Sequence, residues 1–242
     1  MNLVIDVGNT RSKYAFFEGQ ELLNARYSLD TLFEDIGKWK ETGKSIDVFL
    51  SGSGKIDEGV CLLLRELSDS WLEAFPGMDL PLTIGYATPE TLGFDRIAIC
   101  VGAMVLEKGC PLLVIDSGTC ITFNYVSANG EFLGGNISPG LELRFRSLHQ
   151  HTARLPYVHP AENYGEIGRT TEEAIRNGVM NGMLFEVIQY IEYFIKDHKD
   201  GRIVVTGGNS HFLKEKLDFE VRFCDALGFI GLNEILRYAK KV

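Results

Sequence analysis

The stretch LVIDVGNT at residues 3–10 returns in shortened form as LVIDSGT at residues 113–119. Each copy is a run of apolar residues that ends in an Asp-x-Gly turn. Short, continuous apolar runs are typical of strands that are buried on both faces of a sheet. The recurrence therefore indicates an internal duplication, in which each half of the chain begins with the same strand and the same turn.

The residues after each stretch predict the same order of elements: three strands, a helix, a strand and a further helix. The expected strands are 2–7, 12–19, 21–29 and 45–54, then 111–118, 120–127, 130–137 and 202–208. The expected helices are 31–40, 60–75, 94–109, 139–148, 171–198 and 227–241. This order predicts an α/β fold with helices on both faces of the sheets. We place the boundary between the halves near residues 106–112, which gives domains 1–108 and 109–242, with a nucleotide cleft between them.

The composition limits the possible partners. The chain has 242 residues and a net charge of −9, with 24 Lys and Arg against 33 Asp and Glu. Such an acidic surface argues against non-specific binding to nucleic acid or to an anionic membrane. No apolar run approaches the roughly 18–20 residues that a bilayer requires, and no leader-like segment is visible. We therefore expect no nucleic-acid or membrane partner and a cytoplasmic protein, whose five cysteines are structural thiols.

The two Asp-x-Gly turns have the chemistry of a phosphate site. A carboxylate at the tip of a buried strand can hold a cation, and the glycine lets backbone N–H groups approach a ligand closely. Phosphoryl transfer requires such charge neutralisation and positioning. Either turn alone is explained as an ordinary strand-ending turn, but the pair favours a nucleotide site. A third turn, Thr206-Gly207-Gly208-Asn209, is suited to the nucleoside end, whereas no GxxxxGK[ST] or GxGxxG motif is present.

Several longer motifs resemble those of one family. DVGNT (6–10), YATPETLGFDR (86–96), DSGTCIT (116–122), GGNISPGL (134–141) and TARLP (152–156) together resemble the type III pantothenate kinases. These enzymes belong to the acetate and sugar kinase/Hsp70/actin superfamily. The resemblance implies duplicated ribonuclease-H-like (actin-like ATPase) halves, with mixed β-sheets flanked by helices and a central nucleotide cleft. It also implies ATP-dependent phosphorylation of pantothenate, the first step toward coenzyme A.

The resemblance further implies roles for individual residues. Asp95 would be the general base, and Asp116 would bind the monovalent cation, K⁺ or NH₄⁺, that acts beside Mg²⁺ and ATP. Two sets would bind ligands. The ATP set is Asp6, Val7, Gly8, Asn9, Thr10, Arg11, Ser12, Lys13 and Thr119, and the pantothenate set is Tyr86, Gly93, Phe94, Asp95, Arg96 and Thr171. A homodimer would complete the pantothenate pocket.

Several alternatives stay open from the residues alone. Arg96 is explained equally well as the partner of the pantothenate carboxylate or as half of a surface ion pair, and Tyr86 as a loop-anchoring aromatic. His149 and His151 have the HxH spacing of zinc sites, but no third ligand is evident, so surface or interface histidines are favoured. Two rival functions are a sugar or amino-sugar kinase of the same superfamily and a non-catalytic regulator. The regulator would have no need for all three acids, Asp6, Asp95 and Asp116.

Overall fold

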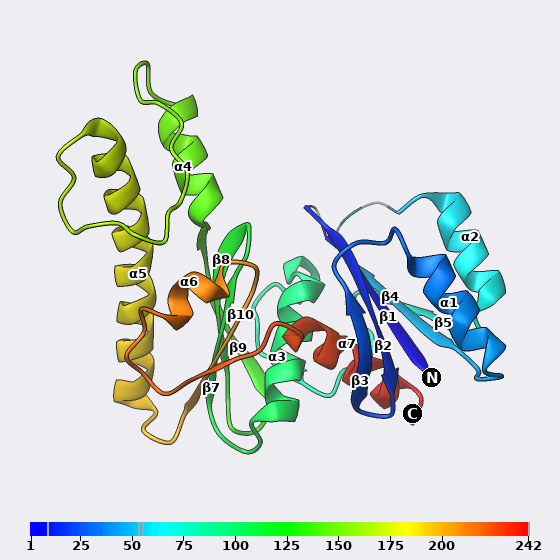
Figure 1. The fold of residues 1–242 in the computed structure, drawn as a ribbon. Coiled ribbons are helices and arrows are strands. Elements are labelled where there is room, and N and C mark those ends of the chain that lie inside the picture. The colour runs from blue at the N-terminus through cyan, green and yellow to red at the C-terminus, as the bar shows by residue number, and fades with distance from the viewer. Residues whose placement is uncertain (9, 53, 55, 242) are drawn as a thin grey trace. The chain divides into compact units, whose positions relative to one another are not determined.

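A computed structural model describes residues 1–8, 10–52, 54 and 56–241 (Figure 1). It divides into two compact units. The first unit contains Met1–Gly109, Gly130–Leu133 and Ala226–Val242, and the second contains Cys110–Asn129 and Gly134–Asp225. Among the described residues, no helix is both long enough and apolar enough to cross a bilayer.

The first unit is built on a five-stranded sheet. Its strands are β1 (Asn2–Val7), β2 (Ser12–Glu18), β3 (Glu21–Arg26), β4 (Asp47–Gly52) and β5 (Ser70–Glu73), in the order β3-β2-β1-β4-β5. The central strand β1 pairs antiparallel with β2 and parallel with β4. Leu3, Val4 and Ile5 of β1 have no exposed surface, as expected for a strand covered on both faces.

The helices of the first unit cover both faces of this sheet. Helices α1 (Leu32–Glu41) and α2 (Glu58–Leu67) pack on one side, where Ile36 and Leu64 join the core around Leu3. Helices α3 (Phe94–Leu106) and α7 (Leu227–Ala239) pack against each other and contact strands β1 and β4. A short strand β6 (Thr83–Ile84) and a 3₁₀ turn η1 (Pro89–Thr91) precede α3. These elements position the beginning of α3.

The second unit has the same strand arrangement. Its strands are β7 (Leu112–Ser117), β8 (Cys120–Val126), β9 (Glu131–Pro139), β10 (Arg202–Thr206) and β11 (Val221–Phe223), and the sheet order is β11-β10-β7-β8-β9-β6. The first residues of β9, through Leu133, belong to the first unit, as β6 does. Strand β7 pairs antiparallel with β8 and parallel with β10, as β1 does with β2 and β4. This shared topology confirms the duplication predicted from the two LVID stretches.

The helices of the second unit are α4 (Leu141–Gln150), α5 (Thr171–Asp197) and the short α6 (Ser210–Lys214). Figure 1 shows α5 running alongside the sheet. Its buried residues Met183, Val187 and Ile191 pack in one core with Leu113 and Ile115 of β7. Helix α5 begins at a capping box, in which the Thr170 hydroxyl accepts from the Glu173 N–H and the Glu173 carboxylate accepts from the Thr170 N–H.

Two predicted helices differ from the structure, and two short elements were not predicted. The predicted helix 60–75 is wrong beyond α2, because Ser68 has an extended backbone and residues 70–73 pair with β4 as β5. The predicted helix 139–148 begins only at Leu141, since Pro139 still belongs to β9. Helix α6 and strand β11 were not predicted; both are too short for a clear periodic pattern.

Candidate active site

The first phosphate turn follows β1. The Gly8 N–H donates to the Arg11 carbonyl at 3.1 Å, which closes the turn, and the Gly54 N–H donates to the Val7 carbonyl at 2.8 Å. Thr10 and Arg11 are exposed, and Ser12 opens β2 opposite Val7. The predicted ATP-binding residue Asn9 lies outside the described residues. The turn thus presents polar side chains and backbone groups beyond the carboxyl end of β1.

Asp6 and Lys13 form an ion pair at this turn. They face each other across β1 and β2, and Lys13 Nζ lies 3.2 Å from Asp6 Oδ2. The Lys13 ammonium also lies 5.5 Å from the centre of the Phe229 ring of α7. Within hydrogen-bonding distance of a carboxylate and over an aromatic ring, the lysine is held in place. A nucleotide phosphate can therefore meet a fixed positive charge here.

The carboxyl group of Asp6 is electrostatically coupled to Asp95. Burial raises the pKa of Asp6 above its ordinary value, the neighbouring Lys13 ammonium opposes that rise, and the negative charge of Asp95 adds to it. Two carboxylates whose negative charges repel each other favour a bound cation, because the cation relieves the repulsion. Both acids thus belong to the first unit, Asp6 at the end of β1 and Asp95 at the start of α3.

Asp95 is held at the start of α3. Its Oδ1 accepts from the Arg96 backbone N–H at 2.8 Å, and its side chain is exposed. The carboxylate folds back over Gly93, the N-cap of the helix, where an added Cβ would lie 2.4 Å from Oδ1. A side chain at position 93 would collide with the Asp95 carboxylate, which explains the glycine of LGFDR. Phe94 anchors the turn by packing edge-on against Phe49 at 5.9 Å.

Arg96 and Tyr86 lie together around the aromatic ring of Phe132. The Arg96 guanidinium lies 5.9 Å from the Tyr86 ring and 5.3 Å from the Phe132 ring, and the two rings meet edge-to-face at 5.8 Å. Arg96 is only 6% exposed. This burial argues against the alternative in which Arg96 is half of an ion pair on the surface. Tyr86 does pack as an anchoring aromatic, and it packs on Arg96. Both belong to YATPETLGFDR (86–96), which we call the substrate segment because most of the predicted pantothenate set lies in it.

The second phosphate turn follows β7. Asp116 is partly buried at the end of the strand, and Thr119 is exposed. The Gly118 N–H donates to the Cys120 carbonyl at 3.0 Å, and the Gly140 N–H donates to the Thr119 carbonyl at 3.0 Å. The PGL motif that opens α4 thus supports the turn from outside. In register, Asp116 lies beside Thr206 of β10, just as Asp6 lies beside Ser51 of β4.

The third turn packs directly on the second. Gly207 has a φ of 98°, and an added Cβ would lie 2.4 Å from Asp116 Oδ1. The Asn209 backbone N–H donates to the Ser117 carbonyl at 2.9 Å, and its side-chain amide donates to the Gly118 carbonyl at 3.2 Å. This glycine turn therefore fixes the position of the Asp116 carboxylate.

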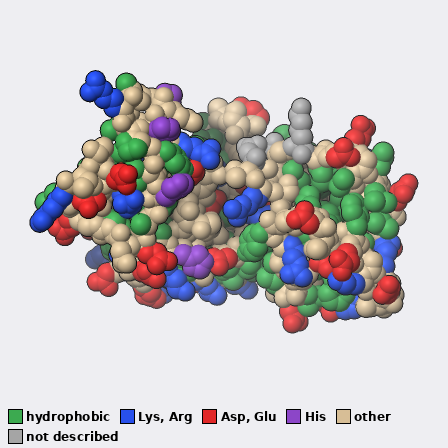
Figure 2. All heavy atoms as spheres, turned by 45° about the horizontal axis from the view of Figure 1, so that its top comes forward, with side chains coloured by type: hydrophobic (Ala, Val, Ile, Leu, Met, Phe, Trp, Pro, Cys, Tyr) green, Lys and Arg blue, Asp and Glu red, His purple; other side chains and the backbone are tan. Residues whose placement is uncertain are grey.

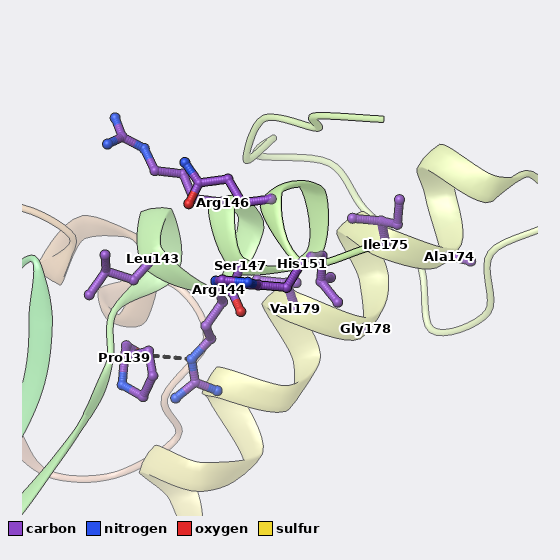
Figure 3. A pocket seen from close by; sticks show the side chains of 12 residues that line it. Pro139, Leu143, Arg144, Arg146, Ser147, His151, Ala174, Ile175, Gly178 and Val179 are labelled. Atoms are coloured by element: carbon purple, nitrogen blue, oxygen red, sulfur yellow. Dashed lines mark hydrogen bonds between the residues drawn. The ribbon is translucent and has the colours of Figure 1, made fainter. Parts of the chain in front are cut away.

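The remaining predicted residues lie on and around α5. Thr171 is the first residue of α5 and is exposed. A hollow of about 720 Å³ lies between α4 and α5, and Figure 3 shows Arg144 beside it donating to the Pro139 carbonyl. His151 borders the hollow, whereas His149 bonds the Leu155 carbonyl at 2.9 Å. In the part of the chain that the structure describes, no three His, Cys, Asp or Glu side chains gather as a metal site.

Figure 2 shows acidic and basic side chains interspersed on the face in view. Lys13 at the first turn and Arg96 at the start of α3 are the cationic residues whose contacts are described above. Phe132 supports the site although it lies in none of the motifs, whereas Gly140 of GGNISPGL and Asn209 of the third turn support the second turn through hydrogen bonds. Each acts on a residue that is distant in the chain.

A model of the family described as type III pantothenate kinase matches residues 2–193. The chain is 39% identical to a type III pantothenate kinase of Bacteroides fragilis (strain YCH46), over 98% of both chains. It shares the fold of a Campylobacter jejuni protein provisionally described as a Baf-family transcriptional activator, with a TM-score of 0.60, 22% identity and coverage of 99% and 100%. A Sinorhizobium meliloti protein provisionally described as a 2-dehydro-3-deoxygalactonokinase has a TM-score of 0.58 at 11% identity, with both chains fully covered. These likenesses confirm the predicted fold class.

Proposed function

Because this chain belongs to the type III pantothenate kinase family, we propose that it transfers the γ-phosphoryl group of ATP to the primary hydroxyl of pantothenate, with Asp95 as general base. The product is 4'-phosphopantothenate, so the reaction is the first step of coenzyme A biosynthesis. The observation that carries the mechanism is the placement of Asp95 at the start of α3, exposed and held by the Arg96 backbone N–H at 2.8 Å, in the same unit as the Asp6–Lys13 ion pair of the first phosphate turn.

Asp95 accepts the proton as the hydroxyl oxygen attacks. The new bond forms between that oxygen and the γ-phosphorus, the bond from phosphorus to the β,γ-bridging oxygen breaks, and ADP leaves. The Arg96 N–H holds one carboxylate oxygen of Asp95. That hydrogen bond fixes the direction of the other oxygen, which is the one suited to receive the proton. A positioned base of this kind contributes roughly 10²–10⁴ in rate.

The first turn binds the phosphates of ATP. In this proposal, Lys13 and the N–H and hydroxyl groups of residues 6–13 contact the phosphate oxygens. Mg²⁺, when bound with ATP, neutralises charge on the phosphates. The residues fit that ion, because Asp6 is a partly buried carboxylate at the end of β1 beside the phosphate turn, and Mg²⁺ is usually held by one or two carboxylates together with phosphates.

The substrate segment recognises pantothenate. The Arg96 guanidinium, desolvated and stacked, pairs with the substrate carboxylate, since a carboxylate and a guanidinium match in charge and in planar geometry. Tyr86, Gly93 and Phe94 line the acceptor site. We assign Thr171 to pantothenate on the family motif, and its exposed position at the beginning of α5 leaves its hydroxyl accessible.

The second turn holds the monovalent cation. Asp116 supplies a carboxylate, and Thr119 contacts ATP from the same turn. Carboxylate and carbonyl oxygens are the donors that hard cations prefer, so the residues present fit K⁺ or NH₄⁺. The tight packing of Gly207 on Asp116 supports the assignment, because it fixes the carboxylate at one place.

The homodimer is proposed on α4 and α5. Phe185 is 63% exposed and Tyr193 62%, and large apolar side chains with so much exposed surface on one helix suit a protein interface. The hollow between α4 and α5 adds a concave, mostly apolar receiving surface of about 720 Å³ (Figure 3). A second copy of the chain is the occupant that the family resemblance implies.

Release of ADP tests the function. Purified protein with ATP should release ADP only when pantothenate is added, and more slowly when sodium replaces potassium. Release with a sugar or an amino sugar but not with pantothenate would favour the rival kinase. Nucleotide binding without any release would favour the regulator. Equal rates in sodium and potassium would remove the monovalent-cation role of Asp116.

Substitution of Gly207 tests the support of the second turn. Gly207→Ala should lower activity at least tenfold, because the methyl group would displace Asp116 and because φ of 98° costs a non-glycine residue about 1–3 kcal/mol. Gly208→Ala is the matched control, since no atom lies within 4 Å of its added Cβ. Steady-state rates at saturating and limiting potassium measure the effect. Equal activity of the two variants would contradict the proposed support.

A further inference from the structure

We propose that Phe132 is a positioning residue that sets the enzyme's selectivity for the acceptor carboxylate by fixing Arg96 and Tyr86. The inference rests on the proposed role of Arg96 and extends it to a residue outside the substrate segment. Phe132 itself is fully buried, so we infer that it acts through its neighbours.

The backbone of Phe132 holds the segment that leads to Tyr86. Strand β6 pairs in parallel with the opening of β9, so that Ile84 lies opposite Phe132. The Gly85 N–H donates to the Phe132 carbonyl at 2.9 Å, and the Thr83 N–H donates to the Gly130 carbonyl at 2.9 Å. Hydrogen bonds to the Gly130 and Phe132 carbonyls therefore hold the segment that leads into Tyr86.

The ring of Phe132 holds the two side chains. It lies 5.3 Å from the Arg96 guanidinium and meets the Tyr86 ring edge-to-face at 5.8 Å. The guanidinium thus rests over two aromatic rings, each with a negative face. Because Arg96 is nearly excluded from water, these faces stabilise the cation and restrict its orientation more than an aliphatic neighbour would. A guanidinium held in one orientation binds a planar carboxylate better than a guanidinium that rotates freely.

The inference predicts a specific loss. A smaller aliphatic residue at 132 should weaken binding of ligands that carry the carboxylate and leave the other ligands nearly unaffected. Pantothenol is the matched probe, because a hydroxymethyl group replaces the carboxylate and the remaining atoms are the same. The quantity to measure is the ratio of the dissociation constants of pantothenol and pantothenate in the presence of a non-hydrolysable ATP analogue, by calorimetry.

Two variants of Phe132 separate shape from charge. Phe132→Leu should reduce that ratio by roughly three- to thirtyfold, the range expected for cation–π contacts from exposed to desolvated ones. A trifluorinated phenylalanine at 132 keeps the shape of the ring but weakens its negative face, and it should reduce the ratio in the same direction. The second variant also decides the question if Phe132→Leu does not fold.

The controls distinguish this inference from the proposal beneath it. Phe16→Leu removes an equally buried ring of the same unit, which contacts Tyr14 and Trp39, and it should leave the ratio unchanged. Arg96→Met should abolish the preference for pantothenate; if it does not, the proposed role of Arg96 is wrong. If Arg96→Met abolishes the preference while both Phe132 variants keep it, the positioning role alone is overturned.

Discussion

Asp95→Asn is expected to lower kcat by roughly 10²–10⁴ with small changes in the KM values for ATP and pantothenate. The asparagine side-chain oxygen can still accept from the Arg96 N–H, so the beginning of α3 keeps its hydrogen bond. What is lost is the carboxylate that takes the proton from the attacking hydroxyl. Steady-state kinetics with both substrates varied would measure the loss.

The control for this variant is another exposed acid nearby. Glu90 lies in the 3₁₀ turn before α3 and has no proposed role. Glu90→Gln should retain normal turnover, and the thermal midpoints of both variants should match that of the unchanged protein. An Asp95→Asn enzyme that keeps kcat within a few-fold would mean that the proton leaves by another route.

Asp6→Asn is expected to produce the second large loss, of roughly 10²–10³ in kcat/KM for ATP, comparable to removal of one preorganised electrostatic group elsewhere. The carboxylate would no longer hold a cation at the phosphates, and Lys13 would lose its partner at 3.2 Å. Varying ATP and Mg²⁺ separately would show whether the loss follows the metal–nucleotide complex.

Asp47 provides the matched control for Asp6. It lies at the opposite end of the sheet, at the beginning of β4, and its carboxylate also pairs with a lysine, Lys240, at 2.5 Å. Asp47→Asn should cost some stability, because the pair is partly buried, without changing the kinetics for ATP. If Asp6→Asn reduces kcat/KM no more than Asp47→Asn does, Asp6 has no phosphate role.

The sequence predicted the repeated part of the fold because its signal is local. The LVID runs are continuous and apolar, and the structure places both as central strands with the aspartate next to the last position. The segment VCLLLRELSDSWLEAF was wrongly predicted as one helix over 60–75, because its apolar residues have helical spacing on both sides of Ser68-Asp69. There, pairing of residues 70–73 with β4 overrides local preference. The domain division at residue 108 and the cytoplasmic location stay predictions.

The candidate site was predictable where a motif is contiguous. The LGFDR motif predicted roles for Asp95 and Arg96. The structure explains why Gly93 precedes them, because the Asp95 carboxylate folds over it. The supporting residues were not predictable, because their signal is spatial. Phe132 reads as an ordinary strand residue, and its ring meets Arg96 only after β6 pairs with β9. The approach of Gly207 to Asp116 likewise depends on the pairing of β7 with β10, two strands that are distant in the chain.

The central claim is that Asp95 takes the proton of the pantothenate hydroxyl. The most direct test is a crystal structure with pantothenate and a non-hydrolysable ATP analogue, in which the distance from the Asp95 carboxylate to the primary hydroxyl oxygen is measured. The account predicts about 2.6–3.2 Å, or one intervening water. A hydroxyl beyond that reach, with another acid in contact with it, would contradict the account.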